Sequence, residues 1–183
     1  ISVVNNGGVI DENGGVSGGK FAYMDKSGKI ISKWYDDTFD FYEGMGMVRS
    51  GDKYGFLDKS CKEVVELKYE KAWNFSNGMA GVMLNGKFGY VDKTGKLVIP
   101  AKYDQVYNFN NEVAVVVNNA EIDEVTGEIF AGEYFLIDKK GNQLSKVYDT
   151  IYESSDGVLV FKKEDKYGVI DLTKFPIKDY LSF

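Results

Sequence analysis

Histidine is absent from this chain, and its absence excludes several kinds of chemistry. Histidine is the usual general base near neutral pH and the commonest metal ligand in proteins. Catalytic arrangements of the Ser-His-Asp and Cys-His type therefore cannot form. From the residues that remain we expect a protein that is not an enzyme, with no catalytic residue, no metal site and no cofactor.

Cysteine and long apolar runs are also scarce. The single cysteine cannot form an internal disulfide, so it does not decide between an oxidising and a reducing compartment. No apolar run approaches the length that spans a membrane, and we expect no membrane insertion. The net charge of −6, with acidic and basic residues interspersed, argues against a nucleic-acid partner, because phosphates are neutralised by clustered Lys and Arg.

The dominant feature of the chain is a tandem repeat. A six-residue segment with an aromatic residue near its start and Asp at its end occurs at 20–25, 53–58, 87–92, 133–138 and 166–171. Successive final Asp residues are 33, 34, 46 and 33 residues apart. A fixed period of this length is typical of a repeat architecture rather than of a single globular core.

The long third interval contains an insertion at 119–132. Val-Val-Asn-Asn precedes this insertion and recurs at 3–6, so we interpret 1–19 as the tail of a preceding repeat with a similar inserted loop. We expect one array over 1–183 that is part of a longer one. Its repeats are predicted at 20–52, 53–86, 87–132 and 133–165, with the start of a degenerate last repeat at 166–183.

The pattern within one repeat predicts a three-stranded antiparallel meander followed by a short link strand. Asn85-Gly86 between two apolar runs indicates a hairpin, since both residues tolerate the positive φ of a type I′ turn. A second turn has the form Asp-Lys-Ser/Thr-Gly, and Cys61, which replaces its Gly in one copy, is expected to be a strained turn residue. In each link two aromatic residues are expected on one face and in the core: Phe39 and Phe41, Trp73 and Phe75, Tyr107 and Phe109.

The central strand is apolar on both sides. Tyr54 and Phe56 point one way and Gly55 and Leu57 the other. Such a sheet must be covered on both faces, so neighbouring sheets should stack, with each aromatic near the small residue of the adjoining copy. This favours an all-β array stacked as an open β-solenoid. A closed β-propeller is the alternative, although its blades usually repeat every 40 to 45 residues or so.

These residues resemble the bacterial WG-repeat (WG/KWG) family. Its pattern of aromatic-Gly, apolar-apolar-Asp, a Gly turn, Val-Ile-Pro and Lys-Tyr-Asp is matched at 88–92, 94–100 and 102–104. Tyr or Phe replaces the Trp, and Ala22 and Phe135 replace the Gly in two copies. The resemblance implies an all-β repeat of a bacterial, often surface or secreted, protein with no shared catalytic residues.

Aligned copies produce two acidic columns: Asp25, Asp58, Asp92, Asp138 and Asp171, and Asp36, Glu70, Asp104 and Asp149. Stacked carboxylates can bind Ca²⁺, but each turn also carries Lys, so we interpret these acids as turn caps beside solvated lysines. Acids spread periodically along a stack offer no unique pair for glycosidase chemistry.

Trp34 is the candidate ligand-contact residue. Its counterparts are Lys68, Lys102 and Val147, so its indole is expected to be partly exposed, with local packing as the alternative role. The inserted loops, 5–19 and 118–132, should lie on one face of the stack, which in repeat proteins is often the binding face.

Three hypotheses about function follow. The first is a noncatalytic bacterial scaffold that binds a protein or a cell-surface carbohydrate through the loops and the Trp34 region. The second is a structural spacer or assembly module that makes end-to-end contacts with further repeats. The third is a Ca²⁺-stabilised adhesin array. The expected location is extracellular or at the bacterial cell surface, with the cytoplasm as the alternative.

Overall fold

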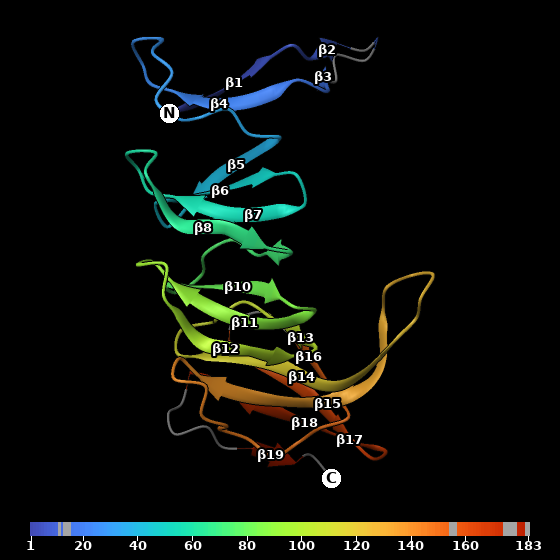
Figure 1. Ribbon diagram of the computed structural model, residues 1–183. Coiled ribbons are helices and arrows are strands. Elements are labelled where there is room, and N and C mark those ends of the chain that lie inside the picture. The colour runs from blue at the N-terminus through green and yellow to red at the C-terminus, as the bar shows by residue number, and fades with distance from the viewer. Residues whose placement is uncertain (11, 13–15, 154–156, 174–178, 182–183) are drawn as a thin grey trace.

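The computed structural model describes residues 1–10, 12, 16–153, 157–173 and 179–181, and every regular element among them is a β-strand (Figure 1). Small antiparallel sheets are stacked along one axis, with the first and the last described strands at opposite ends (Figure 1). The stack does not close into a ring, so the open solenoid is confirmed. No helix long and apolar enough to cross a membrane occurs in the described ranges.

The described residues form six sheets, of which five follow one another along the stack. The first pairs β1 (Ser2–Asn6) with β4 (Lys20–Met24), and β2 (Val9–Ile10) with β3 (Val16–Ser17) extends their hairpin. The second contains β5 (Asp37–Tyr42), β6 (Met45–Ser50), β7 (Lys53–Leu57) and β8 (Glu63–Tyr69). The third contains β9 (Lys71–Ala72), β10 (Met79–Leu84), β11 (Lys87–Asp92) and β12 (Leu97–Tyr103). The fourth contains β13 (Gln105–Val106), β14 (Val113–Ile122) and β15 (Ile129–Asp138). The fifth contains β16 (Thr150–Glu153), β17 (Val158–Lys163), β18 (Lys166–Asp171) and β19 (Asp179–Leu181).

The link strand of each repeat belongs to the sheet of the next one. β5 pairs with β6, β9 with β10 and β13 with β14. The chain therefore leaves one sheet and enters the following sheet almost without a loop: β8 ends at Tyr69 and β9 begins at Lys71. Successive sheets are joined by this short crossing as well as by packing.

Both faces of an inner sheet are buried. Phe56 and Leu57 are neighbours on β7, and both are 0% exposed. Phe56 packs in one cluster with Ala80 and Val82, which lie on β10 of the following sheet. Leu57 packs in another cluster with Tyr23 of the preceding repeat. The prediction that each sheet is sandwiched between its neighbours is confirmed.

Edge-to-face aromatic pairs join successive sheets. Their ring centroids are 4.9 Å apart in Tyr23–Phe41, 4.9 Å in Phe56–Phe75 and 4.8 Å in Tyr90–Phe109. Such pairs contribute about 0.5–1.5 kcal/mol beyond the burial of their surface. The same contact is thus made three times, at equivalent positions of three repeats.

The glycine of the aromatic-Gly pair lies against the third strand of its own sheet. A Cβ on Gly89 would lie 2.4 Å from the carbonyl oxygen of Ile99 and 2.7 Å from the nitrogen of Ala101, both on β12 of the same sheet. Gly55 is similarly placed, 2.6 Å from the carbonyl oxygen of Val65 on β8. The cause is the irregular register of these third strands, which brings their backbone against the glycine.

Ala22 and Phe135 occupy the glycine position in the first and fourth copies for a local reason. There the third segment forms isolated bridges instead of a continuous strand. The hydroxyl of Ser32 accepts a hydrogen bond from the backbone nitrogen of Tyr23 at 2.8 Å, and Ser145 has the same role in the fourth copy. Without the close strand, a side chain fits where the other copies need glycine.

The Asp that ends each central strand caps the turn that follows it. The Oδ1 atom of Asp58 accepts hydrogen bonds from the nitrogen of Ser60 at 2.8 Å, its hydroxyl at 2.6 Å and the nitrogen of Lys62 at 3.1 Å. Asp25 makes the equivalent bonds in the first copy. The Ser60 hydroxyl, followed by the Lys62 nitrogen, holds the pKa of the Asp58 carboxyl below its ordinary value.

Cys61 has a φ of 61°, where Gly28 at the matching position has 86°. This left-handed conformation is unfavourable for a residue with a Cβ, so the prediction of a strained turn residue is confirmed. Burial, and after it the charge of Asp58, raises the pKa of the Cys61 thiol. A raised pKa keeps the thiol protonated and therefore a poor nucleophile.

The turn carboxylates make stability depend on pH. Because the folded-state pKa of Asp25 and Asp58 is lowered, their contribution is present above the unfolded value, about 3.9, and is lost as pH falls through the lower folded values. Urea midpoints are expected to fall between about pH 4 and pH 2. Asp58→Asn should flatten this dependence, whereas Asp52→Asn at an exposed hairpin position is the control. Equal slopes for both variants would contradict the capping role.

Gly89→Ala is expected to destabilise the protein by roughly 1–3 kcal/mol, because the new methyl group meets backbone atoms that cannot move independently of β12. Ala22→Gly in the first copy is the matched control, and should change the free energy of unfolding by no more than about 1 kcal/mol. Urea unfolding measures both. Similar losses in the two variants would show that the close third strand is not the cause.

Candidate ligand groove

The links carry two series of aromatic residues with different surroundings. Phe39 packs with the cluster between the second and third sheets, whereas Phe41 packs with Tyr23 between the first and second. The prediction that both share one face is therefore wrong. The register of β5 shifts between Thr38 and Phe41, and this irregularity turns the second ring to the opposite side of the sheet.

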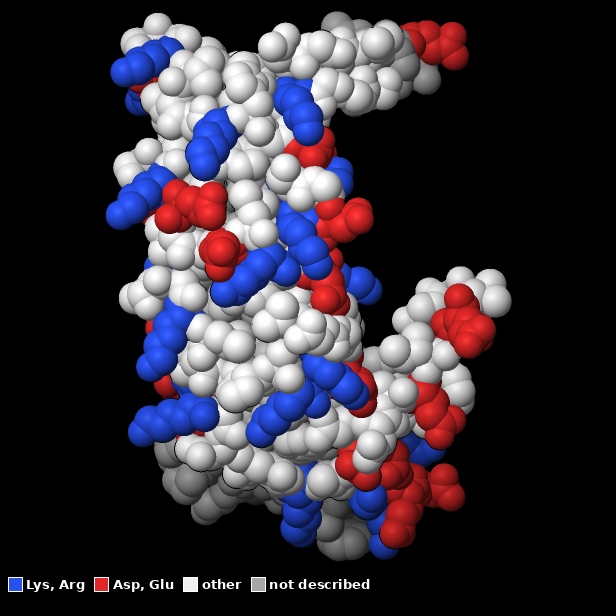
Figure 2. Space-filling model, in the orientation of Figure 1, with Lys and Arg blue, Asp and Glu red and all other residues white. Residues whose placement is uncertain are grey.

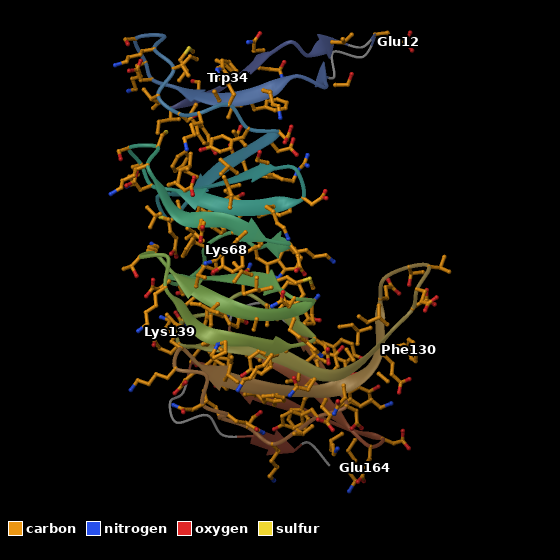
Figure 3. The ribbon with its side chains drawn as sticks, in the orientation of Figure 1. Glu12, Trp34, Lys68, Phe130, Lys139 and Glu164 are labelled. Carbon is orange, nitrogen blue, oxygen red and sulfur yellow. The ribbon has the colours of Figure 1, made fainter. Side chains whose placement is uncertain are left out.

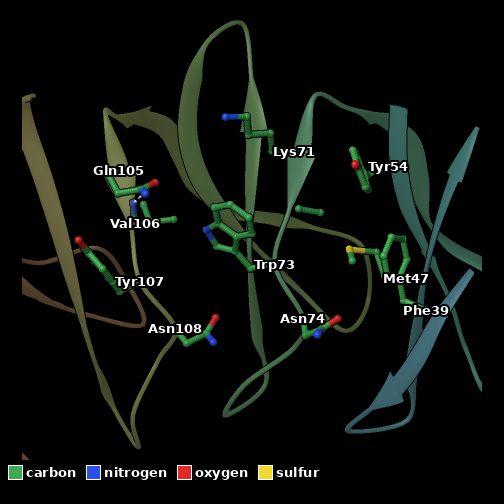
Figure 4. Close-up of a pocket in the computed structure, with 11 residues that line it drawn as sticks. Phe39, Met47, Tyr54, Lys71, Trp73, Asn74, Gln105, Val106, Tyr107 and Asn108 are labelled. Carbon is green, nitrogen blue, oxygen red and sulfur yellow. Dashed lines mark hydrogen bonds between the residues drawn. The ribbon is translucent and has the colours of Figure 1, made fainter. Parts of the chain in front are cut away.

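The first aromatic of each link faces an open groove. Phe39, Trp73 and Tyr107, from three successive repeats, line a groove of about 800 Å³ (Figure 4). Tyr152, the equivalent residue of the next link, lines a further hollow of about 280 Å³ together with Tyr107. The groove is also lined by Met47, Tyr54, Lys71, Ala72, Asn74, Gln105, Val106 and Asn108.

Trp73 lies at the centre of this groove (Figure 4). Its ring stacks on Phe88 with centroids 5.6 Å apart and planes 20° from parallel. It also lies over Gly81, where a Cβ would be 2.6 Å from its Cδ1 atom. Met47 and Val115 occupy the position of Gly81 in the neighbouring repeats. The largest aromatic of the series therefore faces the smallest residue on the adjoining strand.

Sequence reasoning assigned Trp73 to the core and missed the groove. The signal it overlooked was the coincidence of Trp73 with Gly81, which no other copy reproduces. A glycine in a strand interior often marks a site where another group approaches closely. Here the approaching group is the indole.

Buried tyrosines hold the backbone of the groove in place. The hydroxyl of Tyr90 donates to the carbonyl oxygen of Tyr107 at 2.6 Å, and the hydroxyl of Tyr23 donates to that of Phe39. Burial, followed by the neighbouring Tyr107, raises the pKa of Tyr134 to about 12, so this phenol stays neutral. Two groove aromatics are thus anchored through their own main chain to the core.

Amide side chains accompany the aromatic rings. Asn74 and Asn108 directly follow Trp73 and Tyr107, and Figure 4 shows them on either side of the indole. An amide carries both a hydrogen-bond acceptor and two donors. Lys71 is the single charged residue in the lining of this groove. The arrangement combines apolar ring faces with neutral polar groups that both donate and accept hydrogen bonds.

Trp34, the predicted ligand contact, does not line this groove. Its side chain is 41% exposed on the first repeat, as expected from the lysines at its counterpart positions (Figure 3). Lys68 and Lys102, those counterparts, are exposed too. The structure does not bring Trp34 together with Trp73, and its role in binding stays a prediction.

The second acidic column connects each link to the hairpin turn beside it. Glu70 accepts hydrogen bonds from the nitrogens of Asn85 and Gly86, both at 2.9 Å. Asp104 forms an ion pair with Lys87. Among the residues that the structure describes, no three Cys, Asp or Glu side chains gather in a way that could hold a metal ion. The Ca²⁺-stabilised array stays a hypothesis.

The inserted loops project from the same side of the stack, and part of the first lies outside the described residues (Figure 1). The second loop, 118–132, and the adjoining Glu133 contain five acidic and no basic residues. The remaining 23 acidic and 22 basic residues of the chain nearly cancel, so most of the net charge lies on this one hairpin (Figure 2). Ile122, Val125 and Phe130 are exposed on it.

Comparison with known families agrees with this repeat structure. The family model described as WG containing repeat matches residues 21–54, 54–88, 88–120 and 134–167, which together make up most of the chain. No curated protein matches the chain significantly. The glycines shared with the family pattern, Gly55 and Gly89, are those that admit the close third strand. The chain belongs to the family of WG containing repeats.

Proposed function

We propose that this chain is a noncatalytic binding scaffold whose ligand lies along the aromatic groove of the links. The observation that carries the proposal is the series Phe39, Trp73 and Tyr107, contributed by three successive repeats to a single open groove. Mostly apolar concave sites with a few polar groups are the usual location of ligands. Equivalent contacts repeated along a stack favour an extended ligand over a compact one.

The carboxylates support the noncatalytic part of this proposal. The pKa of Asp36 is lowered chiefly by its bond from Lys20, and that of Glu43 chiefly by its bond from Lys93. A glycosidase-type general acid needs the opposite, a carboxyl group with a raised pKa beside a second carboxylate in a cleft. Lys71, the charged residue of the groove, has no carboxylate beside it in the lining.

The partner we propose is a protein or carbohydrate of a cell surface, and the location is extracellular or at the surface of a bacterium, as the family resemblance implies. A nucleic acid is disfavoured because the chain is net negative and its charge gathers on a projecting hairpin.

Trp73→Ala is expected to weaken ligand binding about 30-fold or more, the usual loss for a central aromatic contact. Trp34→Phe leaves Trp73 as the single tryptophan, so its fluorescence reports on the groove. This variant should be titrated with soluble glycans and with secreted and envelope proteins, and the ligand should give a saturable change. Trp34→Ala, at an exposed tryptophan outside the groove, is the matched control.

Loss of binding in Trp34→Ala with full binding in Trp73→Ala would reject the groove in favour of the Trp34 region. Turnover of a bound compound, abolished by replacing one pair of acidic residues, would reject the noncatalytic role.

A structural spacer or assembly module is the second candidate, favoured by the exposure of apolar residues on the terminal sheets. Val3 is 45% exposed and Val169 is 39% exposed. Their counterparts in the fourth sheet, Val116 and Leu136, are each 0% exposed. The terminal faces therefore resemble the surfaces that stack inside the array.

If these faces pair with further repeats, the chain should associate through them as its concentration rises. Val3→Lys and Val169→Lys are expected to abolish the association that light scattering detects, because a charge cannot be buried between sheets without a partner. Val125→Lys, on the projecting hairpin, is the control. Association that survives both terminal changes would contradict the spacer.

A further inference from the structure

We infer that the ligand of the aromatic groove is a neutral, extended, β-linked carbohydrate chain, bound with its sugar rings against the aromatic series. The inference rests on the proposed function and specifies the class of ligand. It is carried by the chemistry of the groove lining and by the spacing that the repeat imposes on it.

The lining matches the two kinds of surface that a sugar ring presents. A pyranose has a face of C–H groups, which packs on an aromatic ring, and an edge of hydroxyls, each of which both donates and accepts hydrogen bonds. Trp73 and Tyr107 supply rings to the groove. Asn74, Asn108 and Gln105 supply amides, which also donate and accept.

A proline-rich peptide fits this lining less well. Its polyproline II backbone presents carbonyl acceptors, and each proline removes one N–H donor. The NH₂ groups of Asn74 and Asn108 would find partners, but their carbonyl oxygens would be covered without donors. Covering a polar group without a partner costs free energy, so the peptide is disfavoured relative to a ligand rich in hydroxyls.

The charge of the groove points to a neutral ligand. Lys71 is the one charged side chain in the lining. Recognition of a polyanion would call for several cations and would be opposed by the net charge of −6. Recognition of a cation would be opposed by the positive charge of Lys71, and the lining contains no carboxylate to pair with the cation.

The geometry of the stack sets the spacing of the contacts. Stacked β-sheets are about 10 Å apart, so equivalent side chains of successive repeats recur at about that interval. Figure 4 shows Phe39, Trp73 and Tyr107 in a row across the strands of three sheets. An extended β-1,4-linked chain of pyranoses advances by a similar distance for every two sugars. Successive aromatic residues of the row would then contact alternate sugar rings of the ligand.

The test measures affinity as a function of ligand length. β-1,4-linked oligomers of glucose and of N-acetylglucosamine, from disaccharide to tetrasaccharide to hexasaccharide, are titrated into the Trp34→Phe protein with Trp73 emission as the readout. For at least one series, affinity is expected to rise about fivefold or more with each added pair of sugars, as one more ring reaches an aromatic. Tyr107→Ala should remove one of these gains in affinity for the hexasaccharide and leave the affinity for the disaccharide unchanged.

Two further variants complete the test. Tyr107→Phe keeps the ring and should keep the gain in affinity. If Trp73→Ala unfolds, Trp73→Leu replaces it, because it removes the ring and keeps an apolar side chain, and binding is then measured by calorimetry. Equal affinity for disaccharide and hexasaccharide would overturn the ring-per-repeat arrangement. A proline-rich peptide that perturbs Trp73, with no response to either sugar series, would overturn the carbohydrate inference while leaving the groove as the functional site. No response of Trp73 to any glycan, peptide or protein would overturn both.

Discussion

Burial of both faces of every inner sheet is the constraint on which the rest of this structure depends. Phe56 and Leu57 are adjacent on β7 and yet both fully buried, each against a different neighbouring sheet. Burying one such side chain contributes roughly 1.5–3 kcal/mol, which an isolated sheet cannot obtain on both sides. Stability is therefore a property of the stack, shared between neighbours through recurring pairs such as Tyr90 with Phe109.

The same constraint produces the candidate site. A chain that builds stacked sheets must pass from each sheet to the next, and it does so in the short step around Glu70, whose carboxylate is bound to the next hairpin turn. The link that follows has one aromatic residue in the core and one that lines the groove. Because this crossing recurs in every repeat, the aromatic residues that line the groove form a row. Hydrogen bonds from the core, such as that from the Tyr90 hydroxyl to the Tyr107 carbonyl oxygen, keep the row in place.

Residues close together in one link thus serve two purposes, one stabilising the stack and the other lining the groove. Phe75 is buried against Phe56, whereas Trp73, two residues earlier, reaches the groove. Aromatic residues suit both tasks, since their faces pack equally well on other rings and on the apolar face of a ligand. The side chain on the adjoining strand makes the difference: Gly81 leaves room for the indole, and Met47 and Val115 fill the same position beside the smaller rings.

Local patterns were enough to predict the repeat, the turn at Asn85-Gly86 and the two apolar sides of the central strand, because turn propensity and strand alternation depend on neighbours in the chain. The sheet to which each link belongs, and the side to which Phe39 and Phe41 turn, could not be predicted, because an irregular register in β5 breaks the alternation. The need for glycine at position 89 has the same origin: it depends on the path of β12, a strand that folds back from later in the chain. These features are set by contacts between backbones that meet in space, and spacing along the chain does not encode where they meet.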